Sequence, residues 1–206
     1  MALSIIRHPL AQHYLTHLRD ETTKPALFRT LARKLTTLLT LEACRSLRTA
    51  MLRISTPIEE LWSPVLDADL VVVPVLRAGL GMLDAVVDLF PDVSVGYIGL
   101  ERDEVTAEAS AYYHKLPSLQ GRTVLLIDPM LATGGSACKA TATLRAGGAA
   151  RVVIVCIVAA PEGVRRVESL HPEVAIYTAA LDRGLDDRKF IVPGLGDFGD
   201  RLYGTN

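Results

Sequence analysis

Long hydrophobic runs, paired cysteines and a strong net charge are all missing from this sequence of 206 residues. It contains no run of about 18 or more uncharged apolar residues, so we predict no membrane-spanning helix. The amino terminus, MALSIIRHPL, has no basic start followed by a long apolar core, so we expect no signal peptide and a cytoplasmic location. The formal net charge of −1 argues against broad affinity for nucleic acid.

The sequence has little that could form a metal site. Cys44, Cys138 and Cys156 lack C-x-x-C spacing, so we predict neither a disulfide framework nor a zinc site and interpret them as small core residues. His13 and His17 are one helical turn apart, a spacing that can bind a metal. With no third ligand near them in the sequence, we predict no protein metal site.

The amino-terminal part is basic. Lys and Arg outnumber Asp and Glu by nine to five before residue 65, and are outnumbered thirteen to eighteen after it. Helical periodicity at 10–18 and 26–47 favours the solvated faces of helices, although an interface or an effector site stays open. We interpret 56–64 as a connection or an extended arm. The expectation is one domain, 1–206, with a helical N-terminal region at 1–65.

Apolar runs and helical segments alternate through the rest of the chain. Runs at 70–76, 93–98, 124–127, 151–158 and 175–178 predict strands, and 81–89, 136–146 and 161–170 predict helices. This βαβ spacing predicts an α/β fold with a central, mostly parallel sheet flanked by helices on both faces.

The most informative stretch for function is TVLLIDPMLATGGS, residues 123–136. It predicts a buried strand that Pro129 ends, followed by a glycine pair and a helix. Gly134 and Gly135 allow close approach of a ligand, and the free N–H groups at the start of the helix attract negative charge. Thr133 and Ser136 add hydroxyl donors, so this segment predicts a monophosphate site.

A carboxylate stands at the mouth of this predicted anion site. Asp128 would repel phosphate unless it faced sugar hydroxyls or a metal-bound water, so we predict a sugar phosphate as ligand. A nucleotide-binding P-loop needs Lys directly after its last glycine, where this chain has Ser136, so we exclude it. The structural alternative is a strand–loop–helix turn with glycines for tight packing.

Three further segments are candidates. Arg77, at the carboxyl end of a strand and beside glycines, is either a planar fork for phosphate oxygens or a surface arginine. The polar segment 99–116 predicts a flexible flap between strands. The glycines of the tail, 190–206, spell G-x-G-x-x-G, but too few residues follow for a dinucleotide site. The tail either grips a flat base with exposed backbone groups or is a structural terminal loop.

These motifs resemble those of the type I phosphoribosyltransferases, and most closely the uracil phosphoribosyltransferase family. DPMLATGGS (128–136) resembles its phosphoribosyl pyrophosphate (PRPP) loop, VPVLRAGLG (73–81) its pyrophosphate loop, and IVPGLGDFGDR (191–201) its base-binding hood. The resemblance implies the type I phosphoribosyltransferase fold, with a flap at 99–116 and a hood at 186–206. The implied reaction is PRPP plus uracil giving UMP and pyrophosphate, a pyrimidine salvage step.

The resemblance also implies roles for single residues. Arg102 and Asp128 are the implied catalytic residues. The implied PRPP-binding residues are Arg77, Arg102, Asp128, Pro129, Met130, Leu131, Ala132, Thr133, Gly134, Gly135, Ser136 and Asp197. Uracil would contact main-chain groups of Ile191, Gly196 and Phe198, with Asp197 beside them. Mg²⁺ would be carried mainly by PRPP, the protein would be a homodimer or larger, and GTP is an effector of some members.

This chain departs from the family pattern at several positions. Glu101 replaces a usual Tyr, Val105 a usual acidic residue and Phe198 a common Ala, while Lys189 and Phe190 replace a more usual Gly and Tyr. Two alternatives stay open. One is an RNA-binding relative, which would need a basic surface stripe, and the other is a phosphoribosyltransferase for a purine, which would differ only in the hood.

Overall fold

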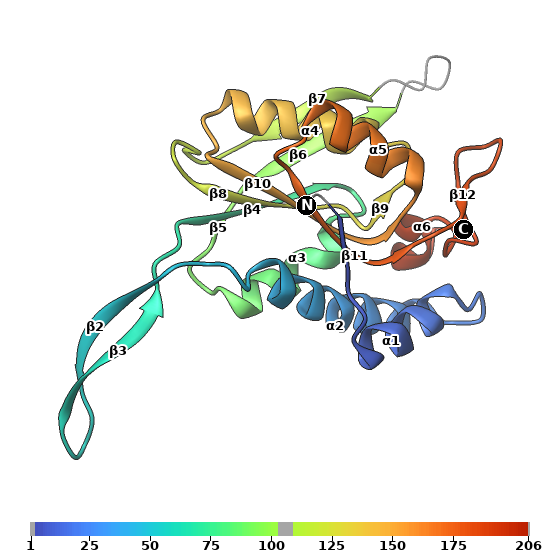
Figure 1. Cartoon of the computed structure of the whole chain (residues 1–206). Helices are drawn as coiled ribbons and strands as arrows, with labels where there is room; N and C mark the ends of the chain where they lie inside the picture. The colour runs from blue at the N-terminus through green and yellow to red at the C-terminus, as the bar shows by residue number, and fades with distance from the viewer. Residues whose placement is uncertain (1–2, 103–108, 206) are drawn as a thin grey trace.

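The protein, seen as a computed structural model that describes residues 3–102 and 109–205, is built on one large sheet with helices on both faces (Figure 1). The strand order is β1-β11-β10-β8-β4-β6-β7, with β5 added beside β4 and β9 beside β10. The elements of this sheet and its helices are β1 (Leu3–Ile5), α1 (Pro9–Arg19), α2 (Pro25–Ala43), β4 (Leu70–Leu76), α3 (Leu80–Leu89), β5 (Ser94–Val95), β6 (Tyr97–Arg102), β7 (Ala109–Lys115), β8 (Thr123–Ile127), β9 (Met130–Leu131), α4 (Gly135–Ala146), β10 (Arg151–Ala159), α5 (Pro161–Leu170), β11 (Ala175–Leu181) and α6 (Phe198–Tyr203).

The sheet is parallel except at one edge. All described pairings from β1 through β6 in the strand order are parallel, and only β6 and β7 run antiparallel. Val71 and Val73 face one core while Val72, between them, faces the other. Both faces are therefore buried, which is why these strands are continuously apolar in sequence. The predicted α/β fold with a mostly parallel sheet is confirmed.

Two helical layers cover the sheet. α1, α2, α3 and α6 pack on one face, where Phe28, Met82 and Phe198 join one core, and α4 and α5 pack on the other, where Ala140 and Val167 join the second (Figure 1). Among the described helices, none is long and apolar enough to cross a membrane.

The N-terminal region, 1–65, is less helical than predicted. α2 ends at Ala43 rather than at Leu47, whose N–H donates to the Cys44 carbonyl in the following turn. The chain then forms an antiparallel hairpin, β2 (Thr49–Ser55) and β3 (Glu60–Leu66), that projects from the body of the protein (Figure 1). We call this hairpin the arm. The extended-arm interpretation of 56–64 was therefore correct, but its strands begin earlier.

The described parts of the predicted flap, 99–116, include strands, since β6 (Tyr97–Arg102) covers its start and β7 spans Ala109–Lys115. The part between the two strands lies outside the described residues, so the flap stays a prediction. β6 and β7 pair in antiparallel register, for example Gly99 with Tyr113, and so extend the sheet at its edge. Val105, one of the departures from the family pattern, lies outside the described residues. The strand expected at 93–98 is split into β5 and β6 around Gly96, whose N–H donates to the Val72 carbonyl.

The tail contains more regular structure than a terminal loop. β12 (Gly184–Leu185) pairs with β13 (Ile191–Val192), and α6 follows the glycine turn. Gly194 and Gly196 have φ values of 60° and 80°, in the left-handed region that favours glycine. The glycines therefore shape a turn between β13 and α6.

Candidate functional site

Two of the predicted loops leave the same edge of the sheet. β4 and β8 are parallel neighbours, with Pro74 opposite Ile127, so Arg77 and Asp128 both follow the carboxyl ends of adjacent strands. A Cβ added to Gly79 would lie 2.7 Å from the backbone oxygens of Ile127 and Val75. The backbones of the two loops are therefore in direct contact, and only glycine fits between them.

A small hollow lies at the start of α4, lined by Asp128 and by residues 130–137 but not by Pro129. The hollow measures about 50 Å³, which suits one small group, and we call it the loop hollow. Gly134 is the N-cap of α4 with a φ of 77°, and a Cβ there would lie 2.8 Å from the Gly163 oxygen. The Gly135 N–H is 3.5 Å from the Thr133 hydroxyl oxygen. N–H groups of the first helical turn thus border a glycine-lined hollow, which is the arrangement expected for an anion site. Its lining residues are Asp128, Met130, Leu131, Ala132, Thr133, Gly134, Gly135, Ser136 and Ala137.

Strand β10 holds the outer part of this loop in place. The Pro129 oxygen accepts from the N–H groups of Ile157 and Val158, at 2.9 and 3.1 Å. Leu131, 3% exposed, has its side chain in the core, and its oxygen accepts from Ala160 at 2.9 Å. Pro129 and Leu131 therefore fix the shape of the loop.

The carboxyl group of Asp128 is a weaker acid than that of a typical aspartate. Its carboxylate accepts one weak hydrogen bond, from the Met130 N–H at 3.4 Å. Burial raises the pKa of Asp128 to about 7, and the Met130 hydrogen bond only partly opposes this rise. The side chain therefore changes between a neutral donor and a charged acceptor close to neutral pH.

A second and larger cavity adjoins the loop hollow. It has a volume of about 270 Å³ and is lined by three segments that are far apart in sequence: Ala78, the pair Met130 and Ala132, and residues 188–191 and 196–199 of the tail. We call it the hood cavity. Met130 and Ala132 line both spaces. Ala78 beside Arg77, the PRPP-loop residues Met130 and Ala132, and the hood therefore border one cavity.

The hood residues divide between cavity and core. The residues that the resemblance implies for uracil, Ile191, Gly196, Asp197 and Phe198, all line the hood cavity. The Phe198 side chain is nevertheless 1% exposed, with its ring 5.1 Å from that of Phe28. The core accommodates its bulk. Asp197 is the N-cap of α6, where it accepts from the Asp200 N–H at 2.9 Å.

The two predicted arginines lie on neighbouring strands. Arg77 is exposed just beyond β4, and its oxygen accepts from the Tyr203 hydroxyl at 3.3 Å. Arg102 is the last residue of β6, which pairs with β4 through Gly99 and Leu76. The backbone thus brings Arg102 to the edge that Arg77 occupies.

Arg188 is a cavity residue that sequence reasoning missed. It lines the hood cavity, and its guanidinium carbon lies 5.3 Å from the centre of the Phe190 ring. Lys189 beside it has a φ of 67°. The β12–β13 pairing, which sets where Arg188 lies, has no signal in the sequence beyond a cluster of charges.

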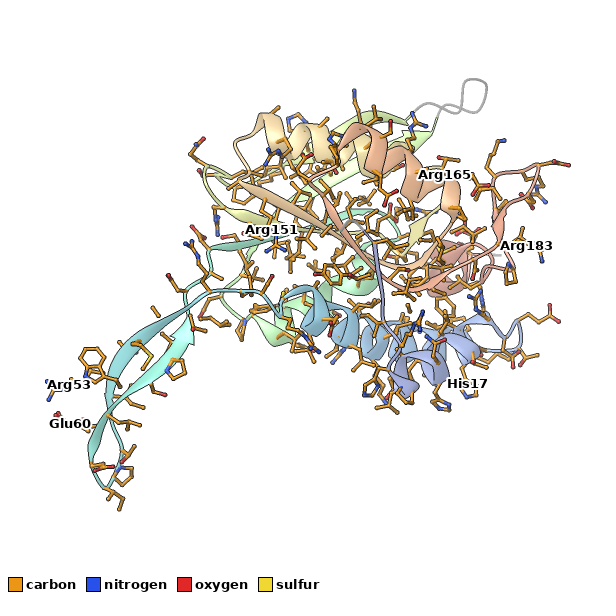
Figure 2. The ribbon with its side chains drawn as sticks, in the orientation of Figure 1. His17, Arg53, Glu60, Arg151, Arg165 and Arg183 are labelled. Carbon is orange, nitrogen blue, oxygen red and sulfur yellow. The ribbon has the colours of Figure 1, made fainter. Side chains whose placement is uncertain are left out.

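The other titratable residues are placed as follows. Cys138 and Cys156 are buried and Cys44 is half-buried, all as free thiols, which confirms the core interpretation. His13 and His17 are exposed on α1 with ring centres 4.7 Å apart, and His17 points outward (Figure 2). Within 3–102 and 109–205, no group of three or more His, Cys, Asp or Glu is placed to hold a metal ion.

Comparison with known proteins identifies the family. The uracil phosphoribosyltransferase family model matches residues 5–205. A uracil phosphoribosyltransferase of Paracoccus denitrificans is 46% identical over 205 residues, which cover 98% of this chain and 97% of that protein.

Solved structures agree with the fold. The structure of the AQ2163 protein from Aquifex aeolicus matches with a TM-score of 0.95 and 36% identity over 99% of both chains. A hypoxanthine-guanine phosphoribosyltransferase of Bacillus anthracis matches with a TM-score of 0.53 and 12% identity over 77% of this chain and 80% of that one, a likeness of fold alone. The architecture is thus the type I phosphoribosyltransferase fold. Because the family model matches almost the whole length of the chain, this chain belongs to the uracil phosphoribosyltransferase family.

Proposed function

We propose that this protein transfers the phosphoribosyl group of PRPP to uracil, giving UMP and pyrophosphate in pyrimidine salvage. The observation that carries this proposal is the common wall, Met130 and Ala132, between the loop hollow and the hood cavity. A ligand with a phosphate in the first space and a base in the second would place its ribose across that wall. A nucleoside monophosphate has this layout.

The chemistry follows from the positions of the charges. The 5′-phosphate lies against the N–H groups of Gly135 and Ser136, which anchor the substrate. Arg77 and Arg102 have the role of stabilising the charge of the diphosphate as it leaves. The bond from C1′ to the diphosphate oxygen breaks, the bond from C1′ to the uracil nitrogen forms, and the proton of that nitrogen passes to the departing diphosphate or to water. Asp128 and Asp197 contact the ribosyl group and favour the positive charge that develops on its ring.

Mg²⁺ enters this proposal as part of the PRPP substrate. Magnesium prefers oxygen ligands and retains several waters, so it binds mainly to substrate phosphates. Asp128 lines the loop hollow and Asp197 the hood cavity, and carboxylates are suitable partners for its waters. When bound, the ion would neutralise diphosphate charge.

The hood gives a physical basis for choosing uracil over cytosine. Cytosine presents an amino donor where uracil has a carbonyl, and its N3 has no proton. A hood of fixed main-chain donors and acceptors around Ile191 and Gly196 would leave groups unpaired with cytosine. Mismatches of this kind reduce kcat/KM by on the order of 10⁴.

The arm supports a homodimer. All seven residues of β2 are exposed, including Leu52, and Trp62 on β3 is 62% exposed. The Arg53–Glu60 ion pair also lies on the arm, away from the body of the protein (Figure 2). An isolated two-stranded hairpin is marginally stable, and contiguous exposed apolar surface marks an interface. A second copy of this chain is the partner we propose. Light scattering should show that Leu52→Glu lowers the mass, while Leu170→Glu, at an exposed leucine on α5, leaves it unchanged.

A basic cavity is the candidate site for GTP as effector. It measures about 530 Å³ between α2, α3 and α6, and Arg29, Arg33 and Lys34 line it together with Tyr203. Since the Tyr203 hydroxyl donates to Arg77, an occupant of this cavity could act on the pyrophosphate loop. GTP should change the kcat of the wild type and of Arg45→Ala, an arginine outside the cavity, but not that of Arg33→Ala.

One assay tests the proposed activity. Protein, Mg²⁺ and PRPP are mixed with uracil, cytosine or hypoxanthine, and release of pyrophosphate is followed. We expect rapid release with uracil alone. Faster release with hypoxanthine would favour the purine alternative, and no release with any base, together with salt-dependent RNA binding, would favour the RNA-binding relative.

Three free cysteines suit the reducing cytoplasm, where we propose that the enzyme acts.

A further inference from the structure

The loop that carries the base-contacting backbone is a thin wall between two cavities. Gly196 lines the hood cavity on one side. On the other side, Gly194, Leu195 and Gly196 line a separate cavity of about 520 Å³, whose opposite wall is the α1–α2 connection. The Leu195 side chain, 3% exposed, anchors this loop in the core, and polar contacts hold its backbone on the side of the second cavity.

Two charged side chains hold the loop at Gly194. Asp182 accepts from the Gly194 N–H at 2.8 Å, and Arg19 donates to the Gly194 oxygen at 2.6 Å. Arg19 also forms a two-pronged pair with Asp182, at 2.8 and 2.6 Å. Both polar groups of one peptide residue are thus bound by one ion pair, which fixes the position and the orientation of the loop.

This ion pair is itself anchored. Asp182 directly follows β11, and its N–H donates to the Ala159 oxygen at the end of β10 at 2.8 Å. Its side chain is 5% exposed, and that of Arg19, the last residue of α1, is 25% exposed. The pair therefore connects the sheet and the N-terminal helix to the hood, in surroundings where charged hydrogen bonds are strong.

A second arginine supports the same loop from α6. Arg201 donates to the Leu195 oxygen at 2.7 Å and to the Leu18 oxygen, and its guanidinium carbon lies 4.6 Å from the centre of the Phe28 ring. Leu18 precedes Arg19 on α1. The carboxyl end of α1 is therefore the support on which the hood is mounted.

We propose that Arg19 and Asp182 are positioning residues for the base. They fix Gly194, and through it the backbone of Ile191 and Gly196, at the place where the ring edge is recognised. Gly194 transmits this constraint closely, because a Cβ there would lie 2.1 Å from the Ile191 oxygen. The identity of the base rests on the proposed function, whereas the mechanical role of the pair does not.

A positioning role predicts a selective kinetic defect. Neither Arg19 nor Asp182 lines the loop hollow, and so PRPP should bind the variants normally. Arg19→Ala should raise the KM for uracil about tenfold or more, since leaving the buried Asp182 without its partner costs well over 1.4 kcal/mol. Arg19→Lys should restore little, because an ammonium cannot reproduce the two-pronged contact.

The experiment compares Arg19→Ala, Arg19→Lys and Asp182→Asn with Arg45→Ala, which removes the exposed Arg45–Glu42 pair at the carboxyl end of α2. We expect a higher uracil KM in the first three variants, a PRPP KM within about twofold of wild type, and a normal control. Millimolar guanidinium should lower the uracil KM of Arg19→Ala alone. Equal losses for both substrates, or no change, would overturn the proposal.

Amide hydrogen exchange gives a second readout that needs no activity. Arg19→Ala should speed exchange at residues 194–196 and leave 135–138 unchanged. Unchanged exchange at 194–196 would contradict the positioning role even if the wild type proved inactive with uracil, in which case the proposed function alone would fail. If Arg19→Ala does not fold, the same comparison is made with Asp182→Asn, which keeps the shape of the side chain.

Discussion

The two ends of the site are built in different ways. The phosphate end is made by consecutive residues, 128–137, whose strand, glycine turn and helix start place N–H groups around a hollow. The hood end is made by a tail loop that is fixed through Arg19, Asp182 and Arg201, which come from three separate parts of the chain. The phosphate site can thus be formed by one short segment of the chain, while the site for the base depends on tertiary contacts.

The largest expected effect on the phosphate end comes from removing the carboxylate of Asp128. Asp128→Asn should lower kcat by about 10²–10³-fold, because the amide no longer offers a negative charge to the developing cation. The KM for uracil should change little. Steady-state kinetics with circular dichroism as the folding control would check this. An unchanged kcat in the folded variant would remove Asp128 from the chemistry.

The same substitution should stabilise the protein at alkaline pH. The pKa of Asp128 is raised to about 7 in the folded state from 3.8, so the folded protein binds the extra proton and its free energy of unfolding falls as pH rises between these values. Asp128→Asn should therefore match wild type near pH 4 and exceed it by about 4 kcal/mol at pH 8. Urea unfolding of both proteins at several pH values measures this difference. A constant difference across pH would contradict the raised pKa.

A comparison of Gly134 with Gly121 separates the effect of backbone conformation from the effect of the space around the residue. Gly134 and Gly121 have nearly the same φ, 77° and 75°, but only Gly134 has backbone atoms within 3 Å of an added Cβ. Both alanine variants should lose about 1–2 kcal/mol of stability from the left-handed conformation. Only Gly134→Ala should also raise the KM for PRPP. Equal PRPP kinetics in the two variants would mean that the loop hollow does not bind the phosphate.

The smallest expected effect comes from the contact between the hood and the loop that carries Arg77. Tyr203→Phe removes the hydrogen bond from α6 to the Arg77 oxygen, which is long at 3.3 Å and exposed. Stability should fall by less than about 0.5 kcal/mol, and kcat/KM by about twofold. Stopped-flow measurement of pyrophosphate release resolves a change of this size. A tenfold loss would show that the hood and the Arg77 loop are more tightly linked than this geometry suggests.

The same contrast explains what could be predicted from sequence. Strands such as 70–76 and helix 161–170 were placed correctly, because buried parallel strands and capped helices have local signals. The glycine turn of the loop hollow also has a local signal, since Gly134 and Gly135 lie a few residues after a strand and at the start of a helix. The pairing of β6 with β7 was missed because the segment 99–116 is polar and charged as a whole, a composition typical of loops.

The support of the hood could not be predicted at all. Arg19 and Asp182 are separated by 163 positions, and each looks like an ordinary charged residue in its own segment. Only the folded chain shows that α1 ends where β11 ends. The placement of the Phe198 side chain could not be predicted from the sequence either, because its ring packs against Phe28 on α2.

The central claim is that one ligand spans the loop hollow and the hood cavity. A crystal structure with UMP tests it most directly. We predict the phosphate within hydrogen-bond distance of the Gly135 and Ser136 N–H groups, and the base against the backbone of Gly196 in the hood cavity. UMP bound elsewhere, such as in the basic cavity beside Arg33, with both of these spaces filled by solvent, would contradict the account.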